Sequence, residues 1–326
     1  MSRLDYGGQA VMEGVMMRGV HEWAVSVRAP SGEIVMRHEA LPRTYRSKLF
    51  RLPFVRGLIS LWDALGLGLR ALIWSSDVAL GEEEDVSFSG PLAWGTVAFS
   101  LAFGIGLFFL LPMFLTTIID RYIPSGVLSN LVEGSMRLGI FVAYLLIIGL
   151  MPDIQRVFAY HGAEHKTINA YEDGARLDSS TVAGYSRVHT RCGTGFMLVV
   201  LVIFVIVATL MGRPPFVVRL LSRIILIPIV AGVSYEIIKL SARAYNDSHA
   251  VRWVMAPGLA LQQLTTREPT EEMLDVAIHA LRQVLVSEGL SEPQTGDVEA
   301  ASSPDSVVVP VPVSVQTLQQ TVQGDN

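Results

Sequence analysis

Residues 91–119 read "PLAWGTVAFSLAFGIGLFFLLPMFLTTII" and contain no charged side chain. Because roughly 20 apolar residues are enough to cross the hydrocarbon core of a bilayer, this stretch predicts a membrane-spanning helix. Pro112 lies within it and predicts a kink, since proline lacks the N–H that an α-helix uses. The stretch therefore decides the fold class, which is a mainly α membrane protein.

Two further apolar stretches follow, from Met136 to Met151 and from Gly195 to Met211. The first contains Arg137 near its start, and we expect this side chain to extend to the membrane interface. The second is rich in β-branched residues, but lipid offers an open strand no hydrogen-bond partners, so we expect a helix there too.

A fourth stretch runs from Phe216 to Leu240 and contains three charged residues, Arg219, Arg223 and Glu236. Each charge near the bilayer centre costs at least ~2.5 kcal/mol, so the sequence leaves open whether residues 216–240 span the membrane. We expect Glu236 to pair with a basic residue that follows it, Lys239 or Arg243. Counting this stretch, the chain has about four transmembrane helices.

Lysine and arginine predict the orientation of the spans. Ten of them precede the first span, only Arg121 lies in the loop 120–134, and five lie in the loop 152–194. The short loop around Arg213 is also basic and weakens the contrast. We expect an inner (plasma) membrane protein with both termini and the loop 152–194 in the cytoplasm.

The segments outside the spans have different patterns. Two alternating runs flank Pro30 to Gly32 and predict a hairpin in an N-terminal β-rich unit. Apolar residues at helical spacing after Thr270, a candidate cap, predict a C-terminal cytoplasmic helix. The predicted division is a β-rich unit at 1–48, an interfacial helix and acidic linker at 49–90, a transmembrane region at 91–240 with the cytoplasmic loop 152–194, a helical segment at 241–290 and a disordered tail at 291–326.

Composition limits the classes of partner. Hydrophobic residues make up 51% of the 326 residues and charged residues 17%, which is more apolar than a soluble domain. The single cysteine, Cys192, excludes an intramolecular disulfide and fits a reducing compartment. The sequence has no phosphate-binding glycine loop and no nucleic-acid-binding face. The expected partner is the lipid bilayer, and the oligomeric state is left open.

The loop 152–194 contains "YHGAEHKTINAYE", in which His161 and His165 lie one helical turn apart on the same face. Two imidazoles so placed can occupy adjacent corners of a tetrahedral zinc site. Glu164 precedes the second histidine and gives the order His-x-x-Glu-His, the inverse of a zinc-hydrolase signature. We expect Glu164 to act as a base toward a water that the metal activates.

The stretch "HTRCGTGF" supplies two further candidate ligands, His189 and Cys192, on the same predicted side of the membrane. If one of them joins the two helix histidines, a position stays open and catalysis is possible, whereas all four would make a closed structural site. Glu172 is too far along the helix to reach the same metal and could support a ligand. A cysteine nucleophile, with His189 as its base, is the alternative to a metal.

These stretches carry a resemblance to a known family. "GGQAVMEGVMMRG", "YHGAEHKTINAYE", "HTRCGTGF" and "APGLALQQLTTREP" together resemble the YqhQ-type family of bacterial multi-pass membrane proteins, which are described as predicted metal-dependent enzymes. The resemblance extends from about Tyr6 to Leu285. It implies membrane location and metal dependence and places five residues in signature stretches, His161, Glu164, His165, His189 and Cys192, but it names no reaction.

The sequence thus predicts a hydrolase-like membrane enzyme that depends on Zn²⁺ or another divalent metal and acts at the cytoplasmic face. Its substrate is unknown, with a membrane-associated peptide or lipid as the class we expect. The alternative is a non-enzymatic scaffold or assembly factor with a structural metal site. A transporter is less favoured, because the first and third spans contain no charged residue.

Overall fold

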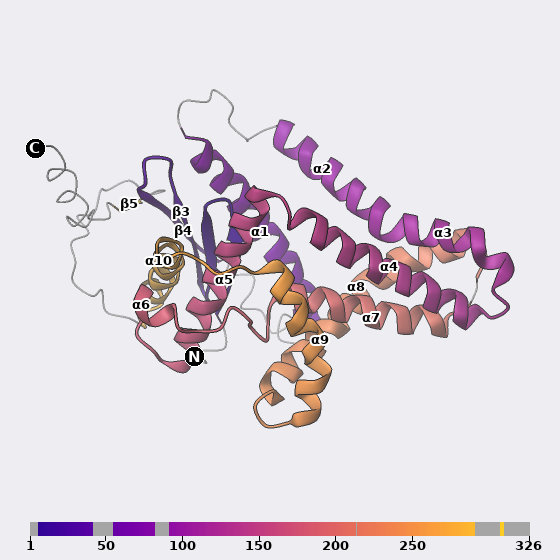
Figure 1. The fold of residues 1–326 in the computed structure, drawn as a ribbon. Helices are drawn as coiled ribbons and strands as arrows, with labels where there is room; N and C mark the ends of the chain where they lie inside the picture. Colours follow the sequence, from indigo (N-terminus) through magenta and orange to yellow (C-terminus); the bar gives the residue numbers. More distant parts are fainter. Residues whose placement is uncertain (1–5, 42–54, 82–90, 213, 291–306, 310–326) are drawn as a thin grey trace, which may run out of the picture.

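The computed structural model describes residues 6–41, 55–81, 91–212, 214–290 and 307–309. These residues form two parts, a small antiparallel sheet packed between helices and an elongated bundle of apolar helices (Figure 1). The predicted fold class, mainly α with an N-terminal β-rich unit, is confirmed.

Four strands form the sheet in chain order, β1 (Gly7–Val11), β2 (Gly14–Arg18), β3 (Glu22–Arg28) and β4 (Ile34–Ala40). The turn between β3 and β4 contains Gly32, whose φ of 89° favours glycine, so the predicted hairpin is present. A short strand, β5 (Val307–Val309), pairs with β4. It belongs to the stretch predicted as a disordered tail, whose other residues beyond 290 lie outside the described residues, as do the acidic residues 82–85.

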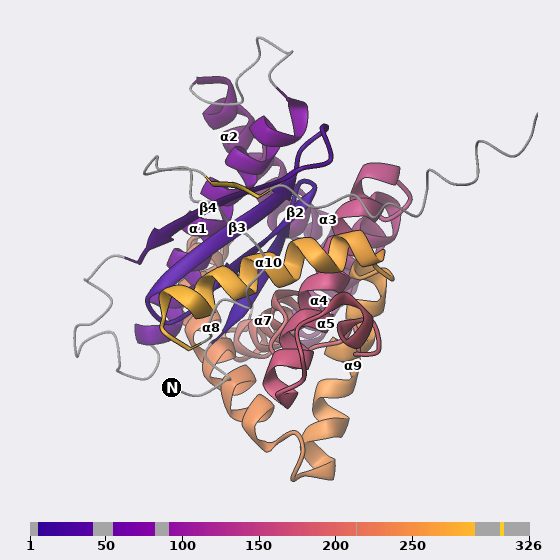
Figure 2. The same ribbon diagram turned by 90° about the vertical axis from the view of Figure 1, so that its left-hand side faces the viewer.

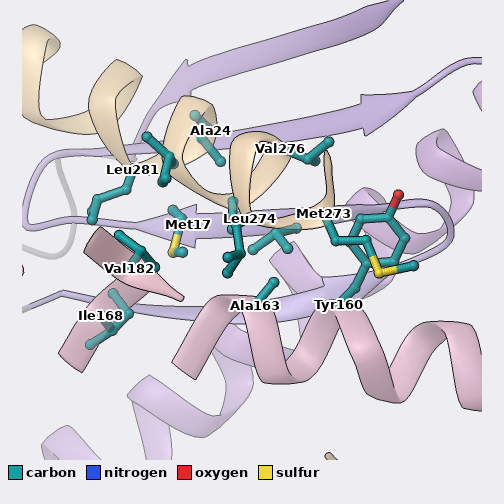
Figure 3. Packing of buried hydrophobic residues seen from close by; sticks show 14 of the residues in the cluster. Met17, Ala24, Tyr160, Ala163, Ile168, Val182, Met273, Leu274, Val276 and Leu281 are labelled. Carbon is teal, nitrogen blue, oxygen red and sulfur yellow. The ribbon is translucent and has the colours of Figure 1, made fainter. Parts of the chain in front are cut away.

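Helices cover both faces of the sheet. On one face, α5 (Pro152–Asp173), the short α6 (Ser179–Val182) and α10 (Glu271–Ser287) pack against the strands, and α10 lies across them (Figure 2). Their shared core includes Met17, Ala163 and Leu274 (Figure 3). On the other face, α1 (Val55–Leu80) packs through Leu67 against Val25 and its neighbours. The C-terminal helix is therefore part of the sheet unit.

Within the described residues, four helical segments are long and apolar enough to cross a membrane. The first is composite and consists of α2 (Pro91–Ile105), the π-helical turn η4 (Gly106–Leu110), α3 (Leu111–Ile119) and the 3₁₀ turn η5 (Asp120–Tyr122). The others are α4 (Gly126–Ile148), α7 (Gly193–Leu210) and α8 (Phe216–Ala244). A last helix, α9 (His249–Thr265), follows α8 and packs against α7.

The second span begins at Gly126 rather than at the predicted Met136. Arg137 therefore lies in the middle of α4, where it is only 2% exposed, and the prediction that it extends to the interface is wrong. Its Nη2 donates to Oε1 of Glu133 at 2.7 Å, and its Nε donates to the carbonyl oxygen of Phe108 at 2.9 Å. Pro112 has no N–H to offer that carbonyl four residues earlier, so the arginine replaces the missing donor.

The charges of the fourth stretch are also paired inside the bundle. Oε2 of Glu133 accepts hydrogen bonds from Arg219 and, at 3.2 Å, from Nη2 of Arg223. Arg219 also donates to Oδ2 of Asp120 at 3.2 Å. We call these five residues the bundle charge cluster: Asp120, Glu133, Arg137, Arg219 and Arg223. Because the helices turn these charges toward one another, residues 216–240 form one continuous apolar helix despite them.

Glu236, near the other end of α8, has a partner that the sequence did not indicate. Its Oε1 accepts a hydrogen bond at 2.7 Å from Nε of Arg56 on α1. The partner lies 180 residues away, and the packing of α1 against α8 brings the two together. Gly57 allows this close approach, since a Cβ there would lie 2.9 Å from the Tyr235 side chain.

Candidate metal centre

Helix α5 carries the two histidines of the central motif. Pro152 occupies its first turn and Gly174, with a φ of 78°, ends it in the left-handed conformation. Between them, His161 and His165 stand one turn apart with ring centroids separated by 4.4 Å. The helix therefore presents both imidazoles to the same space, as their spacing predicts.

The sulfur comes from the start of the third span. Cys192 is the N-cap residue of α7, and its Sγ accepts a hydrogen bond from the N–H of Thr194 at 3.4 Å. A helix N-terminus favours a negatively charged group at this position. Sγ lies 3.4 Å from Nε2 of His161. Ligand atoms of His161, His165 and Cys192 all lie within 4.8 Å of one another, and we call these three residues the ligand group.

Two backbone carbonyls fix the protonation of the histidines. Nδ1 of His161 lies 2.9 Å from the carbonyl oxygen of Thr265, and Nδ1 of His165 lies 2.7 Å from that of Arg187. A carbonyl oxygen can only accept, so each Nδ1 donates to it, and each Nε2 is the nitrogen left to bind a metal. Metal-binding histidines are oriented by such partners on the nitrogen that faces away from the ion.

A glycine allows the first of these carbonyls to reach its histidine. The segment after α9 crosses α5 at Gly162, where a Cβ would lie only 2.1 Å from the carbonyl oxygen of Arg267. The N–H of Arg267 donates to the carbonyl oxygen of Phe158 at 2.8 Å and holds the crossing in place. Any side chain at position 162 would push this segment, and Thr265 with it, away from the helix.

Gln262 on α9 fixes the segment that carries His189 and Cys192. Its Oε1 accepts from the N–H of His189 at 2.9 Å, and its Nε2 donates to the carbonyl oxygen of His189 at 2.8 Å. Sequence reasoning missed the role of α9 in the site. The signal available was a polar pair, Gln262 and Gln263, at the end of a helix whose preceding eight residues are apolar or glycine and proline.

Glu164 lies beside the ligand group in a buried position. It is 4% exposed, and its Oε2 lies 3.4 Å from Nε2 of His165. Strand β1 covers it, since a Cβ on Gly8 would lie 2.7 Å from Cγ of Glu164. Gly8 therefore allows the sheet to close over this carboxylate.

His189 lies next to the ligand group but outside it. Its ring centroid is 5.7 Å from that of His165, and its Nε2 lies 3.5 Å from Oε1 of Glu172, which is also paired with Arg191. Burial raises the pKa of Glu172, but the contacts with His189 and then with Arg191 outweigh burial and hold the pKa below its usual value. The sulfur of Cys192 contacts His161 rather than His189, which is not the arrangement of a Cys192–His189 nucleophile pair.

The ligand group offers two imidazole nitrogens and one cysteine sulfur. This donor set suits zinc, which combines nitrogen and sulfur ligands in tetrahedral sites. Three protein ligands leave a fourth position, and the carboxylate of Glu164 lies close to Nε2 of His165. The geometry is thus that of a possible His/His/Cys metal site with an acid beside it.

Comparisons with known proteins agree with this description. A family described as "Protein of unknown function (DUF1385)" matches residues 52–287. The chain is 35% identical over 303 residues to "Uncharacterized protein YqhQ" of Bacillus subtilis (strain 168), and the alignment covers 88% of this chain and 94% of that relative. No solved structure matches the chain. The family match covers the spans and the candidate site, and neither description names a reaction.

Proposed function

The chain belongs to the DUF1385 family, and we propose that it is a zinc-dependent membrane enzyme that catalyses a hydrolysis. The observation that carries the proposal is the convergence of three ligand atoms from two distant segments within 4.8 Å, beside a buried carboxylate. The chain would act at the cytoplasmic face, because most lysines and arginines outside the spans lie on the side that bears the site.

In this proposal His161, His165 and Cys192 hold the ion through Nε2, Nε2 and Sγ. His189 is turned toward Glu172 and leaves the fourth position open, which is the pattern of catalytic rather than structural zinc sites. When bound, zinc acts as a Lewis acid and lowers the pKa of a water at the open position.

Glu164 is the proposed general base. Its carboxylate lies 3.4 Å from the Nε2 that would face the ion, so a water at the open position would lie within its reach. In a hydrolysis the carboxylate would take one proton from the attacking water. The water oxygen, which keeps its other proton, would bond to the substrate as the bond to the leaving group breaks, and the carboxylate would deliver its proton to that leaving group. Burial beneath β1 keeps bulk water from competing for this proton.

The second candidate is a non-enzymatic scaffold or assembly factor in which the metal only joins segments. One observation favours it: the ligand group and its carbonyl partners tie α5 to the segment before α7 and to the end of α9. A structural ion at this point would connect the sheet unit to the spans.

Metal content tests the site itself. We expect purified wild-type protein to contain about one zinc per chain and the double variant His161→Ala, His165→Ala to contain almost none. His249→Ala is the matched control, because this exposed histidine begins α9 at the end far from Thr265. Equal metal content in the wild type and the double variant would refute the metal site.

Two experiments distinguish the enzyme from the scaffold: one tests for an open coordination position on the metal, and the other tests the role of Glu164 as a base. In protein loaded with Co²⁺, acetohydroxamate should change the visible spectrum if a position is open and should leave it unchanged if four protein ligands close the site. Glu164→Gln should keep the bound metal and the fold but fail to restore function in cells that lack the protein. Normal function of Glu164→Gln would favour the scaffold.

A further inference from the structure

The end of α8 and the start of α9 form a hairpin that belongs neither to the bundle nor to the sheet unit. It projects sideways from the bundle, across the direction in which α4 and α7 run, and both views show this (Figures 1 and 2). It leaves the bundle at the end that carries the site, since the last residue of α9, Thr265, contacts His161. If the spans cross a bilayer, the hairpin lies along its surface.

The surface of this hairpin is apolar, and its two exposed arginines outnumber the one exposed acid, which lies in the loop between the helices. Trp253 is 83% exposed, Val254 75% and Leu240 61%. Two arginines, Arg243 and Arg252, are exposed beside them. In a water-soluble protein such a surface would be costly, because large apolar side chains would face water.

We propose that this hairpin lies in the headgroup layer of the leaflet nearest the metal site and binds anionic phospholipids. Tryptophan is enriched at the membrane–water interface, and an amphipathic helix with basic residues lies in that plane. The arginines complement the negative charge of a cytoplasmic leaflet and add attraction to it. The hairpin continues directly from a span, so the bilayer is already adjacent to it.

The proposed position has a consequence for the substrate, and this consequence rests on the proposed function. Helix α9 runs from Trp253 at the surface to Gln262 and Thr265, which hold the site. A hairpin fixed in the headgroup layer would therefore keep the ligand group at the depth of the lipid surface. A substrate embedded in the membrane, such as a lipid or the juxtamembrane part of a peptide, would reach the site from the bilayer.

Fluorescence quenching of Trp253 tests the position. The full chain is placed in nanodiscs that contain phosphatidylglycerol together with phosphatidylcholine brominated on its acyl chains. The difference between wild type and Trp253→Phe isolates the emission of Trp253. We expect strong quenching by bromines near the headgroup, weaker quenching by bromines at the chain ends and little quenching by acrylamide in the water. Trp94, exposed near the start of the first span, is the positive control through Trp94→Phe.

A second experiment tests whether the attraction between the arginines and anionic lipid positions the hairpin. In nanodiscs of phosphatidylcholine alone, and in the double variant Arg243→Gln, Arg252→Gln, quenching of Trp253 by the shallow bromines should fall at least twofold. Strong quenching by acrylamide and none by lipid would overturn the proposal, as would shielding from both, which indicates a second copy or another protein on the hairpin. Zinc content should not change in the arginine variants, so failure of this proposal is separable from failure of the metal site.

Discussion

The chain buries two polar clusters, and they differ in how their hydrogen bonds are balanced. In the bundle charge cluster both oxygens of Glu133 accept from arginines, and Arg137 also donates to a backbone carbonyl. In the ligand group two imidazole rings and one sulfur lie close together, and the carboxylate of Glu164 lies beside them. The first cluster is largely satisfied by its own members, whereas the second gathers groups that can serve as metal ligands.

The difference separates a structural cluster from a candidate site. Buried ions are tolerated when opposite charges and hydrogen bonds compensate them, and the three arginines and two acids of the bundle achieve most of this. Phe204, which lies under the guanidinium groups of Arg137 and Arg223 at 4.8 and 5.4 Å, supplies further compensation. The ligand group instead brings nitrogen and sulfur atoms together in the way that suits a bound metal ion. The following predictions concern changes to the bundle charge cluster, to the ligand group and its supporting contacts, or to a more exposed ion pair.

The largest effect is expected from Glu133→Gln. This change leaves three buried arginines facing one acid, and removal of one partner from a buried ion pair costs roughly 3–5 kcal/mol. We expect a large loss of thermal stability in detergent, measured against Glu271→Gln at the exposed start of α10. A melting temperature equal to that of the wild type within error would mean that the bundle charge cluster does not stabilise the fold.

Removal of the metal should have the next largest effect. A ligand present at 100 times its Kd stabilises the folded state by about 2.7 kcal/mol, so a chelator should lower the melting temperature of the wild type. The same chelator should leave the double variant His161→Ala, His165→Ala unchanged. If both proteins respond equally, the chelator acts elsewhere and the ligand group is not the metal site.

Gly162→Ala should weaken the site without touching a ligand. The added Cβ would lie 2.1 Å from the carbonyl oxygen of Arg267, so the segment must move and take the carbonyl of Thr265 away from His161. Loss of such a supporting contact typically lowers metal affinity by about 10–100-fold. The measurement is a competition titration with a zinc chelator. Gly139→Ala, where nothing lies within 4 Å of the new Cβ, is the control and should bind zinc like the wild type.

The sequence predicted what depends on local pattern and missed what depends on distant contacts. Uncharged runs and helical spacing were enough to predict the spans, α10 and the shared face of His161 and His165. The start of α4 was misplaced because Glu133 and Arg137 lower the apolar character of that stretch, and only their contacts with α8 make them compatible with a span. The carbonyl of Thr265, an essential part of the proposed site, has no side-chain signature at all.

The contribution of an ion pair to stability also depends on its burial, which the sequence does not reveal. Arg56→Gln tests this dependence, and we expect it to have the smallest effect of the changes considered. Arg56 and Glu236 form a close pair like those of the bundle cluster, but their side chains are 29% and 19% exposed, whereas that of Glu133 is 1% exposed. Water and salt screen a pair at that depth, and such pairs contribute about 0–1 kcal/mol. We therefore expect Arg56→Gln to lower the melting temperature only slightly, and less as salt increases. A fall in melting temperature as large as that of Glu133→Gln would show that burial does not decide how much an ion pair contributes to stability. It would also show that the contact between α1 and α8 holds the sheet unit to the bundle.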